Sequence, residues 1–353
     1  MTRRLLPRLL LLATMASVAL TAALPAQHTN PQNPPALPAQ SEQTIVKEVR
    51  LVDLLFTVVN RRQKFVTDLD KQDFSVFEDG QPQKITNFSR QTDLPLRVGL
   101  LLDTSNSIRD RLKFEQEAAI DFLFNVVRRH KDLAFLMTFD SEPGYVQDYT
   151  EDLGVLRDAI LRQRAGGGTA LYDAIYKACS DRLTNPPLPS PQNPEVRRVL
   201  VVISDGDDNL SNRTRTEAVE MAQRAGVVIY AISTSTQWVT AGKERDPLKQ
   251  ANRKYHKEAG DKALEQLAEE TGGRAFFPYQ VDDLAASFQD IGDELRSQYS
   301  LAYVPSNKSP DGRFRRIRID VDRKGLIVRA RKGYFAPRAA AENARPASGS
   351  PGQ

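Results

Sequence analysis

The stretch Val98-Gly-Leu-Leu-Leu-Asp103-Thr-Ser105-Asn-Ser107 decides the fold predicted for this chain. Its first part is a continuous apolar run, which indicates a strand that is buried on both faces, as in parallel sheets. The carboxylate and the two hydroxyls that follow would then lie at the carboxyl end of that strand. In open α/β sheets this edge binds ligands. The stretch therefore predicts both an α/β sheet and a site at its edge.

Two other segments carry the same signal. The apolar run from Val199 to Ile203 ends in Ser204-Asp205-Gly206, and a run of three glycines at 166–168 leads through Thr169 into a helical pattern. Taken singly, each motif is ordinary turn or helix-cap chemistry. Three loops that converge on one sheet edge offer a set of oxygen ligands instead. The candidate ligands are Asp103, Ser105, Ser107, Thr169 and Asp205.

Apolar runs alternate with helical stretches from Pro95 to Ser297, which predicts a doubly wound, mainly parallel sheet with helices on both faces. The expected strands are Leu96–Leu102, Leu133–Phe139, Val199–Ile203, Val227–Ile232 and Ala275–Phe277. The expected helices are Lys113–Arg128, Thr169–Leu183, Thr216–Ala225, Leu264–Thr271 and Leu284–Leu295. A Pro-rich loop at Asn185–Pro194 and a charged insertion at Trp238–Lys257 interrupt this series.

Short strands of period two lie on both sides of this region. Neither group is large enough to fold alone, so we expect them to pack together as one discontinuous β-sandwich with the α/β domain inserted between them. Ahead of them, Arg3, Arg4 and Arg8 precede an apolar stretch from Leu9 to Leu24 and small residues up to Ala26. This pattern is typical of a signal peptide that is cleaved after Ala23 or Ala26.

No second long apolar segment follows, so we expect no transmembrane anchor after cleavage and a periplasmic or secreted protein. The predicted boundaries are 1–26 for the signal peptide, 27–43 for a Pro- and Gln-rich spacer, 44–92 for the N-terminal β segment, 93–297 for the α/β domain, 298–337 for the C-terminal β segment that packs with 44–92, and 338–353 for a disordered tail.

The composition of the chain limits the kinds of ligand and metal site to expect. The 353 residues are 40% hydrophobic, enough for a sizeable core, and the net charge of +4 is weak evidence for nucleic acid. Cys179 is the single cysteine, and His28, His130 and His256 are far apart in the sequence. Thiolate or imidazole ligation of zinc is therefore not expected, and any metal must be held by oxygen.

Three motifs resemble the metal-ion-dependent adhesion site (MIDAS) of von Willebrand factor type A domains. They are Asp103-x-Ser105-x-Ser107, Thr169 after its glycines, and Ser204-Asp205-Gly206. The resemblance spans about Pro95–Ser297 in the family's order. The flanking segments 73–80, 299–303 and 331–335 resemble a secreted bacterial family related to that domain. The family often has Gly where this chain has Asn106, and Asn tolerates the left-handed backbone better than most residues.

This resemblance implies that Ser105 and Ser107 coordinate a cation directly, Thr169 directly or through water, and Asp103 and Asp205 mainly through water. Neutral ligands leave a hard cation under-neutralised, so a carboxylate from outside can complete its coordination. The expected cofactor is Mg²⁺, with Mn²⁺ or Ca²⁺ as alternatives. The expected partner is a protein that presents Asp or Glu, and the expected role is adhesion or interaction rather than catalysis. The partner's identity and the oligomeric state stay open.

Two other classes of function fit parts of the sequence. A metal-dependent hydrolase or phosphatase could use Asp103 as a nucleophile, but such enzymes resemble Asp-x-Asp at this motif and the chain has Ser105. A nucleic-acid surface could be built on the basic cluster near the C-terminus. Its alternation with apolar residues favours an exposed strand face, and export argues against such a partner. The cluster is Arg313, Arg315, Arg316, Arg318, Arg329, Arg331 and Lys332.

Overall fold

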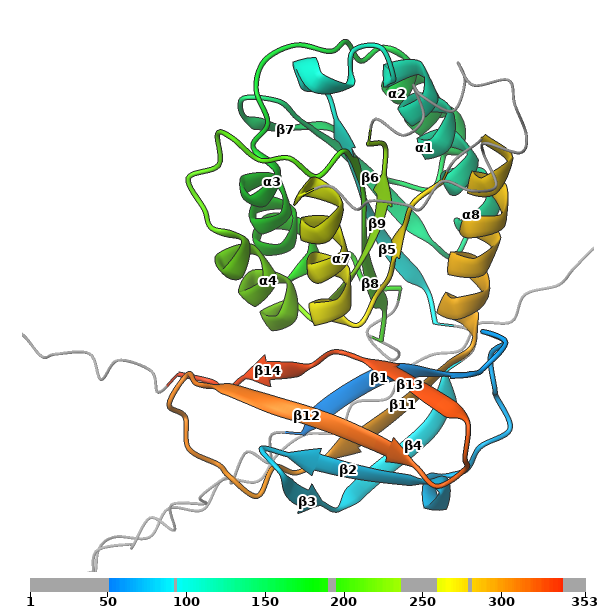
Figure 1. The fold of residues 1–353 in the computed structure, drawn as a ribbon, viewed down its shortest axis with the longest axis vertical. Coiled ribbons are helices and arrows are strands. Elements are labelled where there is room, and N and C mark those ends of the chain that lie inside the picture. The colour runs from blue at the N-terminus through cyan, green and yellow to red at the C-terminus, as the bar shows by residue number, and fades with distance from the viewer. Residues whose placement is uncertain (1–50, 92–93, 190–194, 236–258, 279–280, 339–353) are drawn as a thin grey trace, which may run out of the picture. The chain divides into compact units, whose positions relative to one another are not determined.

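The structure is a computed structural model that describes residues 51–91, 94–189, 195–235, 259–278 and 281–338. The predicted signal peptide, the spacer, the insertion Trp238–Lys257 and all but the first residue of the predicted tail lie outside these residues. Within them the chain forms one six-stranded sheet with helices and two four-stranded antiparallel sheets (Figure 1).

Strand β5 (Leu96–Asp103) lies inside the six-stranded sheet, and all eight of its residues are buried. It pairs in parallel with β6 (Leu133–Phe139) on one side and with β8 (Arg197–Ser204) on the other. A strand flanked in this way has both faces covered by helices, which explains its continuous apolar sequence. The polar residues after β5 and β8 consequently emerge at the same edge of the sheet.

The strand order of this sheet is β10-β9-β8-β5-β6-β7. Strands β9 (Val227–Ser233) and β10 (Ala275–Phe276) continue the parallel part, and β7 (Pro143–Thr150) adds an antiparallel edge. The prediction of a mainly parallel sheet is confirmed. Strand β7 was not among the expected strands, because most of this edge strand is only half-buried and its residues do not form an apolar run.

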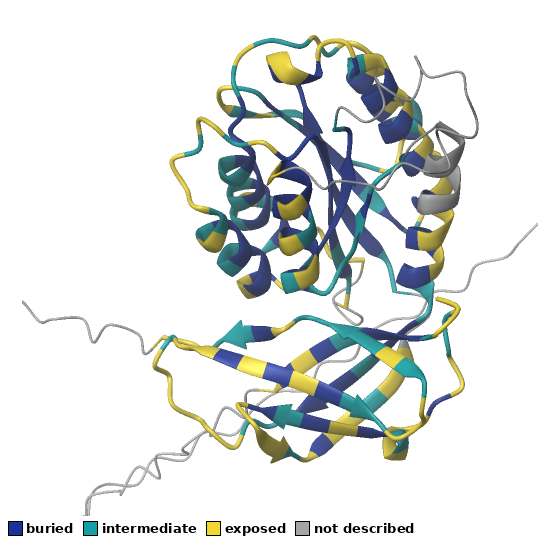
Figure 2. Ribbon diagram, in the orientation of Figure 1, coloured by how far each residue is buried: buried dark blue, intermediate teal, exposed yellow. Residues whose placement is uncertain are grey.

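Helices cover both faces of the sheet (Figures 1 and 2). Each face has its own hydrophobic core, so the doubly wound arrangement is also confirmed. One layer consists of α1 (Leu112–Val126), α2 (Leu153–Leu161) and α8 (Val281–Arg296). The other consists of α3 (Leu171–Ala178), α4 (Arg215–Arg224) and α7 (Ala259–Thr271).

Helix α3 begins two residues later than Thr169, where the sequence predicted its start. The Thr169 carbonyl accepts hydrogen bonds from the backbone N–H groups of Asn209 and Leu210, at 3.0 Å each, so it does not open the helix. At its other end α3 widens into a π-helical turn at Cys179–Leu183.

The two antiparallel sheets have strand orders β13-β1-β11-β4 and β14-β12-β2-β3. Each sheet combines strands from before and after the α/β region, which alternate in the first sheet and meet at the β12–β2 pair in the second. Side chains of both sheets share one core. The predicted discontinuous sandwich is therefore confirmed. The strands are β1 (Val52–Asn60), β2 (Phe74–Glu78), β3 (Gln81–Gln83), β4 (Ile85–Gln91), β11 (Gln298–Tyr303), β12 (Phe314–Val321), β13 (Leu326–Ala330) and β14 (Gly333–Phe335).

The basic cluster is not a uniformly exposed strand face. Residues of β12 alternate between buried and exposed, as the stripes in Figure 2 show. Arg316 and Arg318 are exposed, but Arg315 shares the inward face with Ile317 and is buried. Its charge is balanced by Asp311, whose two carboxylate oxygens each accept a hydrogen bond from Arg315 Nη2 at 2.9 Å. The expectation of exposure was therefore wrong for Arg315.

Candidate functional site

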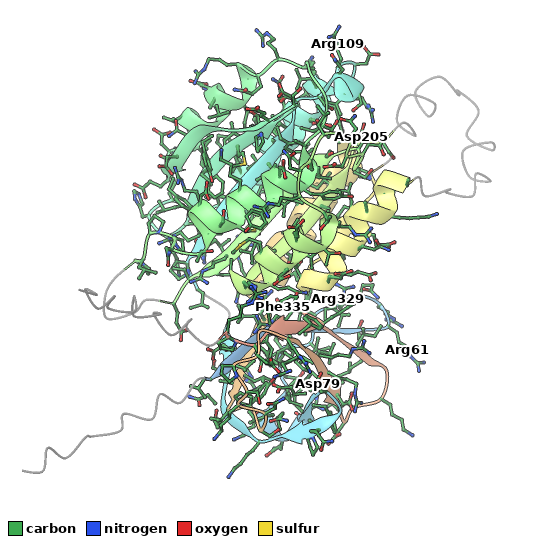
Figure 3. All side chains as sticks on the ribbon, turned by 90° about the vertical axis from the view of Figure 1, so that its left-hand side faces the viewer. Arg61, Asp79, Arg109, Asp205, Arg329 and Phe335 are labelled. Atoms are coloured by element: carbon green, nitrogen blue, oxygen red, sulfur yellow. The ribbon has the colours of Figure 1, made fainter. Side chains whose placement is uncertain are left out.

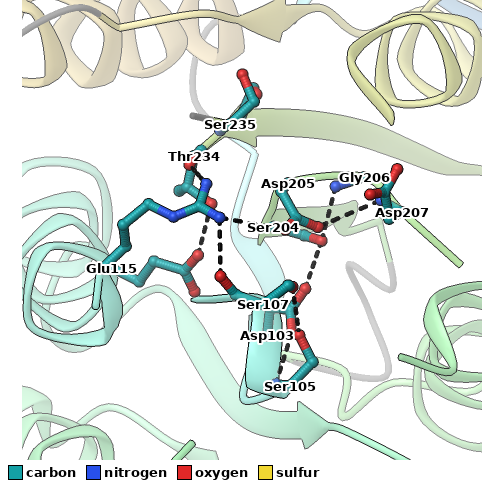
Figure 4. Close-up of polar contacts among 12 residues, drawn as sticks. Asp103, Ser105, Ser107, Glu115, Ser204, Asp205, Gly206, Asp207, Thr234 and Ser235 are labelled. Atoms are coloured by element: carbon teal, nitrogen blue, oxygen red, sulfur yellow. Dashed lines mark hydrogen bonds and ion pairs between the residues drawn. The ribbon is translucent and has the colours of Figure 1, made fainter. Parts of the chain in front are cut away.

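The Asp103 carboxylate occupies the centre of the candidate site (Figure 4). It is fully buried at the end of β5, and both of its oxygens accept hydrogen bonds. The Ser204 hydroxyl at the end of β8 donates to Oδ2 at 2.6 Å, and the Ser105 N–H donates to Oδ1 at 2.8 Å. Burial raises the pKa of Asp103 to about 6, while these two hydrogen bonds act in the opposite direction.

Ser204 belongs to the motif after β8, but sequence analysis assigned it no role. Its hydroxyl accepts a hydrogen bond from the Gly206 N–H at 3.0 Å while it donates to Asp103. The serine thus fixes one carboxylate oxygen and the turn that follows β8. The signal that could have revealed it is its position, since Ser204 ends the strand adjacent to β5.

Ser105 and Ser107 lie on a 3₁₀ turn that follows β5. Their hydroxyl oxygens are 2.9 Å apart, and Ser105 is buried whereas Ser107 is exposed to solvent. Asn106, between them, is not among the described residues with a positive φ. The left-handed backbone considered for this position is therefore not used, because the 3₁₀ turn supplies the geometry instead.

The glycine loop at 166–168 contacts the turn after β5 through its backbone. The Gly166 N–H donates to the Thr104 carbonyl at 2.7 Å, and the Asn106 N–H donates to the Gly167 carbonyl at 3.2 Å. Gly167 has a φ of +77°, a conformation that favours glycine. These bonds place the residues just before Thr169 beside the two serines.

Thr169 joins this loop to the one after β8. Its N–H donates to the side-chain oxygen of Asn209 at 2.9 Å, in addition to the two bonds that its carbonyl accepts. Thr169 is 2% exposed, so its position is fixed by burial as well as by these three hydrogen bonds of its backbone.

Asp205 follows Ser204 and is buried at the same end of the α/β domain as Arg109 (Figure 3). Its Oδ1 accepts a hydrogen bond from the Asp207 N–H at 3.3 Å. The next residue, Gly206, has a φ of +83°, and a Cβ added there would lie 2.3 Å from the Gly260 carbonyl oxygen. The turn that carries Asp205 therefore requires glycine.

Asp208 follows Asp205-Gly206-Asp207, a sequence typical of a solvated turn, but its carboxylate has partners elsewhere in the fold. Its Oδ2 accepts hydrogen bonds from the Tyr172 N–H at 3.0 Å and from the Ser211 hydroxyl at 2.5 Å. Tyr172 lies in the first turn of α3, so the carboxylate caps that helix. Asp207 is exposed, in agreement with a turn residue.

Two charged residues at the start of α1 complete the surroundings and were not predicted. Arg111 is buried, and its guanidinium donates to the carbonyls of Ser107 and Thr234 and contacts Asp205. Glu115, one turn further along the helix, is fully buried and accepts a hydrogen bond from the Thr234 hydroxyl at 2.6 Å. Burial, followed by the nearby Asp103 charge, raises the pKa of Glu115 well above its usual value.

This set of side chains suits a hard cation. Three loops supply three hydroxyls and two carboxylates, all oxygen ligands, which Mg²⁺ and Ca²⁺ prefer. The described residues contain no group of three or more His, Cys, Asp or Glu side chains placed to hold a metal ion. Any cation here would therefore depend on hydroxyls as well as carboxylates, and Ser105, Ser107 and Thr169 carry hydroxyls.

Several solved structures resemble this chain. BatB from Bacteroides thetaiotaomicron is 17% identical, with a TM-score of 0.42 over 57% of this chain and 100% of its own. A von Willebrand factor type A protein from Catenulispora acidiphila is 11% identical, with a TM-score of 0.43 over 82% and 74%. Proximal thread matrix protein 1 from the mussel byssus, with a zinc-occupied MIDAS motif, is 18% identical, with a TM-score of 0.42 over 62% and 49%. No curated protein matches the sequence.

The model of the von Willebrand factor type A domain matches residues 98–294, more than half of the chain. The match begins within β5 and ends within α8, so it includes all three loops of the candidate site. The chain therefore belongs to the von Willebrand factor type A family.

Proposed function

We propose that this protein is an exported binding module that captures an acidic side chain of a partner protein through a divalent cation. Ser105, Ser107 and Thr169 would supply hydroxyl ligands, and Asp103 and Asp205 would act mainly through water. Proteins of this family typically mediate protein interactions through such a metal. The proposal extends that general role to these five residues.

The observation that carries the proposal is the contrast between Asp103 and Ser107. Both oxygens of Asp103 accept hydrogen bonds from Ser204 and Ser105, whereas Ser107 is exposed to solvent and its hydroxyl lies 2.9 Å from that of Ser105. A cation bound by the hydroxyls would have mostly neutral direct ligands, so its charge would be poorly neutralised. It would also have a coordination position open to solvent. A carboxylate from another molecule would satisfy both needs.

Mg²⁺ is the cation that we propose, with Mn²⁺ and Ca²⁺ as the alternatives to test. All five side chains present oxygen, which favours hard cations. A small ion such as Mg²⁺ keeps several waters when proteins bind it, and that matches carboxylates acting through water.

The hydrolase alternative receives less support. An aspartate nucleophile must reach the substrate, but Asp103 is fully buried and hydrogen-bonded on both oxygens. The position of the second carboxylate in such enzymes is taken here by Ser105, which cannot act as a general acid or base at neutral pH. We therefore propose a binding module and not an enzyme.

Export is part of the proposal and depends on residues 1–26, which lie outside the described residues. Among the described residues, no helix is both long and apolar enough to span a membrane. We propose that the cleaved protein acts in the periplasm or outside the cell.

The partner interaction can be tested by capture from envelope extract and culture supernatant. The wild-type protein and the double variant S105A/S107A are immobilised, and each is exposed to extract in Mg²⁺ or in EDTA. The variant S75A, which changes an exposed serine on β2, is the matched control. We expect a partner that is retained by wild type and by S75A in Mg²⁺ only, and that is lost when its own acidic residue is changed to an amide. Equal capture in EDTA, or by S105A/S107A, would refute the proposal.

A further inference from the structure

Arg111 links the loop after β5 to the ends of β8 and β9. It is the N-cap residue of α1, and its side chain is 9% exposed. Nη2 donates to the Ser107 carbonyl at 2.9 Å, and Nη1 donates to the Thr234 carbonyl. Nη2 also lies 3.4 Å from Asp205 Oδ2, so one buried guanidinium contacts a candidate metal ligand and the backbone of another.

The charges around Arg111 are mostly negative. Asp205 is in direct contact, and Glu115 lies one turn further along α1 and interacts electrostatically with Arg111 and with Asp103. Glu115 Oε2 is buried and has no hydrogen-bond partner in the described part of the chain. A guanidinium keeps its positive charge throughout the physiological pH range. It therefore provides a fixed positive charge inside a group of buried carboxylates.

We propose that Arg111 is an intramolecular counter-cation of Asp205, and that a divalent cation and Arg111 compete for this carboxylate. The inference rests on the proposed function, because it assigns Asp205 to the metal. A buried like charge acts at much lower effective dielectric than water provides, so Arg111 weakens the binding of a second cation nearby. It also stabilises the protein when no metal is bound, since it offsets the repulsion between Asp103 and Asp205.

Arg111 thus acts as a positioning residue that sets the metal affinity of the site. The positive charge of Arg111 lowers the affinity of the site for the cation. The cation therefore binds tightly only when an additional negative charge is present at the site. An acidic partner supplies that charge. Metal and partner would therefore bind cooperatively, each strengthening the binding of the other by the same factor.

The test compares wild type with R111Q, which removes the charge but keeps a hydrogen-bond donor, and with R111K, which keeps the charge. R111M retains the apolar stem and replaces R111Q if that variant does not fold. Each protein is stripped with EDTA and titrated with MgCl₂ by calorimetry. We expect at least tenfold tighter Mg²⁺ binding by R111Q, and binding by R111K within threefold of wild type.

Thermal unfolding provides a readout that is independent of affinity. In EDTA, R111Q should unfold at a lower temperature than wild type, and saturating Mg²⁺ should raise its unfolding temperature by more than it raises that of wild type. A residue with a purely structural role would lower both temperatures equally. In the background D205N, the substitution R111Q should change Mg²⁺ affinity by less than threefold, since the shared partner is no longer charged.

The outcomes separate the two proposals. If wild type gives no binding heat with MgCl₂, the proposed function fails. If wild type binds Mg²⁺ while the folded R111Q or R111M binds it equally or more weakly, the inference about Arg111 is overturned and the proposed function stands. The inference would also be overturned if R111Q tightened Mg²⁺ binding in the D205N background as much as in wild type, because the competition would then not involve Asp205.

Discussion

The substitution D103N is expected to stabilise the protein in EDTA and to abolish its response to metal. Burial raises the pKa of Asp103 from 3.8 in its reference state to about 6. Because the pKa is higher in the folded protein, the fold favours the protonated carboxyl, and stability is lost as the pH rises from about 4 to 6. This difference in pKa corresponds to a loss of about 3 kcal/mol in the free energy of unfolding at pH 7.5.

Asn carries no charge, so D103N avoids this cost. We expect it to be more stable than wild type by up to about 3 kcal/mol at pH 7.5 in EDTA, and by about half of that at pH 5. The free energy of unfolding is measured by urea denaturation at both pH values. Saturating Mg²⁺ should reverse the order, since it stabilises wild type alone.

D110N provides the matched control, because Asp110 is an exposed carboxylate shortly after the same motif. Its effect should stay within about 0.5 kcal/mol, as for most surface substitutions. The reasoning would be refuted if D103N were less stable than wild type at pH 7.5 in EDTA, or if the difference did not shrink towards pH 5. Either result would mean that burial of the charged Asp103 carboxylate does not destabilise the folded protein.

Three further predictions concern single positions. S107A removes an exposed hydroxyl ligand, so calorimetry should give at least tenfold weaker Mg²⁺ binding with unfolding unchanged within about 0.5 kcal/mol; unchanged affinity would remove Ser107 from the ligand set. G206A places a Cβ 2.3 Å from the Gly260 carbonyl at a positive φ, and should cost about 2 kcal/mol or more in urea unfolding; a neutral effect would contradict the close approach. Burial raises the pKa of the Cys179 thiol, so iodoacetamide should modify Cys179 only in denaturant, and rapid labelling of the native protein would show an exposed thiol.

Elements of the fold could be predicted where the burial of a strand produces a simple pattern of apolar residues in the sequence. Strands β5 and β8 are covered on both faces, so their sequences are continuous apolar runs, and β6 was predicted at the residues where it lies, Leu133–Phe139. Strand β7 and helix α2 were not predicted. β7 is an edge strand with mixed burial, and α2 spans only nine residues after it.

The candidate site was predictable as far as local motifs reach. Asp103, Ser105 and Ser107 are neighbours in the sequence, and Asp205 follows an adjacent strand. Arg111 could not be found in this way, because it contacts Asp205 across 94 residues and Thr234 across 123. No local spacing encodes such a contact. Only the return of the chain through parallel strands brings these groups together.

Asp208 shows that a recognisable local motif does not reveal its distant partner. Its sequence neighbourhood, Asp205-Gly-Asp-Asp208, is typical of a solvated turn. Its carboxylate nevertheless caps α3, which begins 37 residues earlier in the chain. A local pattern identifies residues that favour turns, but it does not show which distant helix end they cap.

The central claim is that a divalent cation binds between the serines after β5 and the loops that carry Thr169 and Asp205. Anomalous diffraction from crystals grown with MnCl₂ tests it most directly. We predict a manganese peak about 2.1 Å from the hydroxyl oxygens of Ser105 and Ser107, the distance at which hard cations of this size bind oxygen. Crystals that show manganese elsewhere on the protein, with none beside these two hydroxyls, would contradict the account.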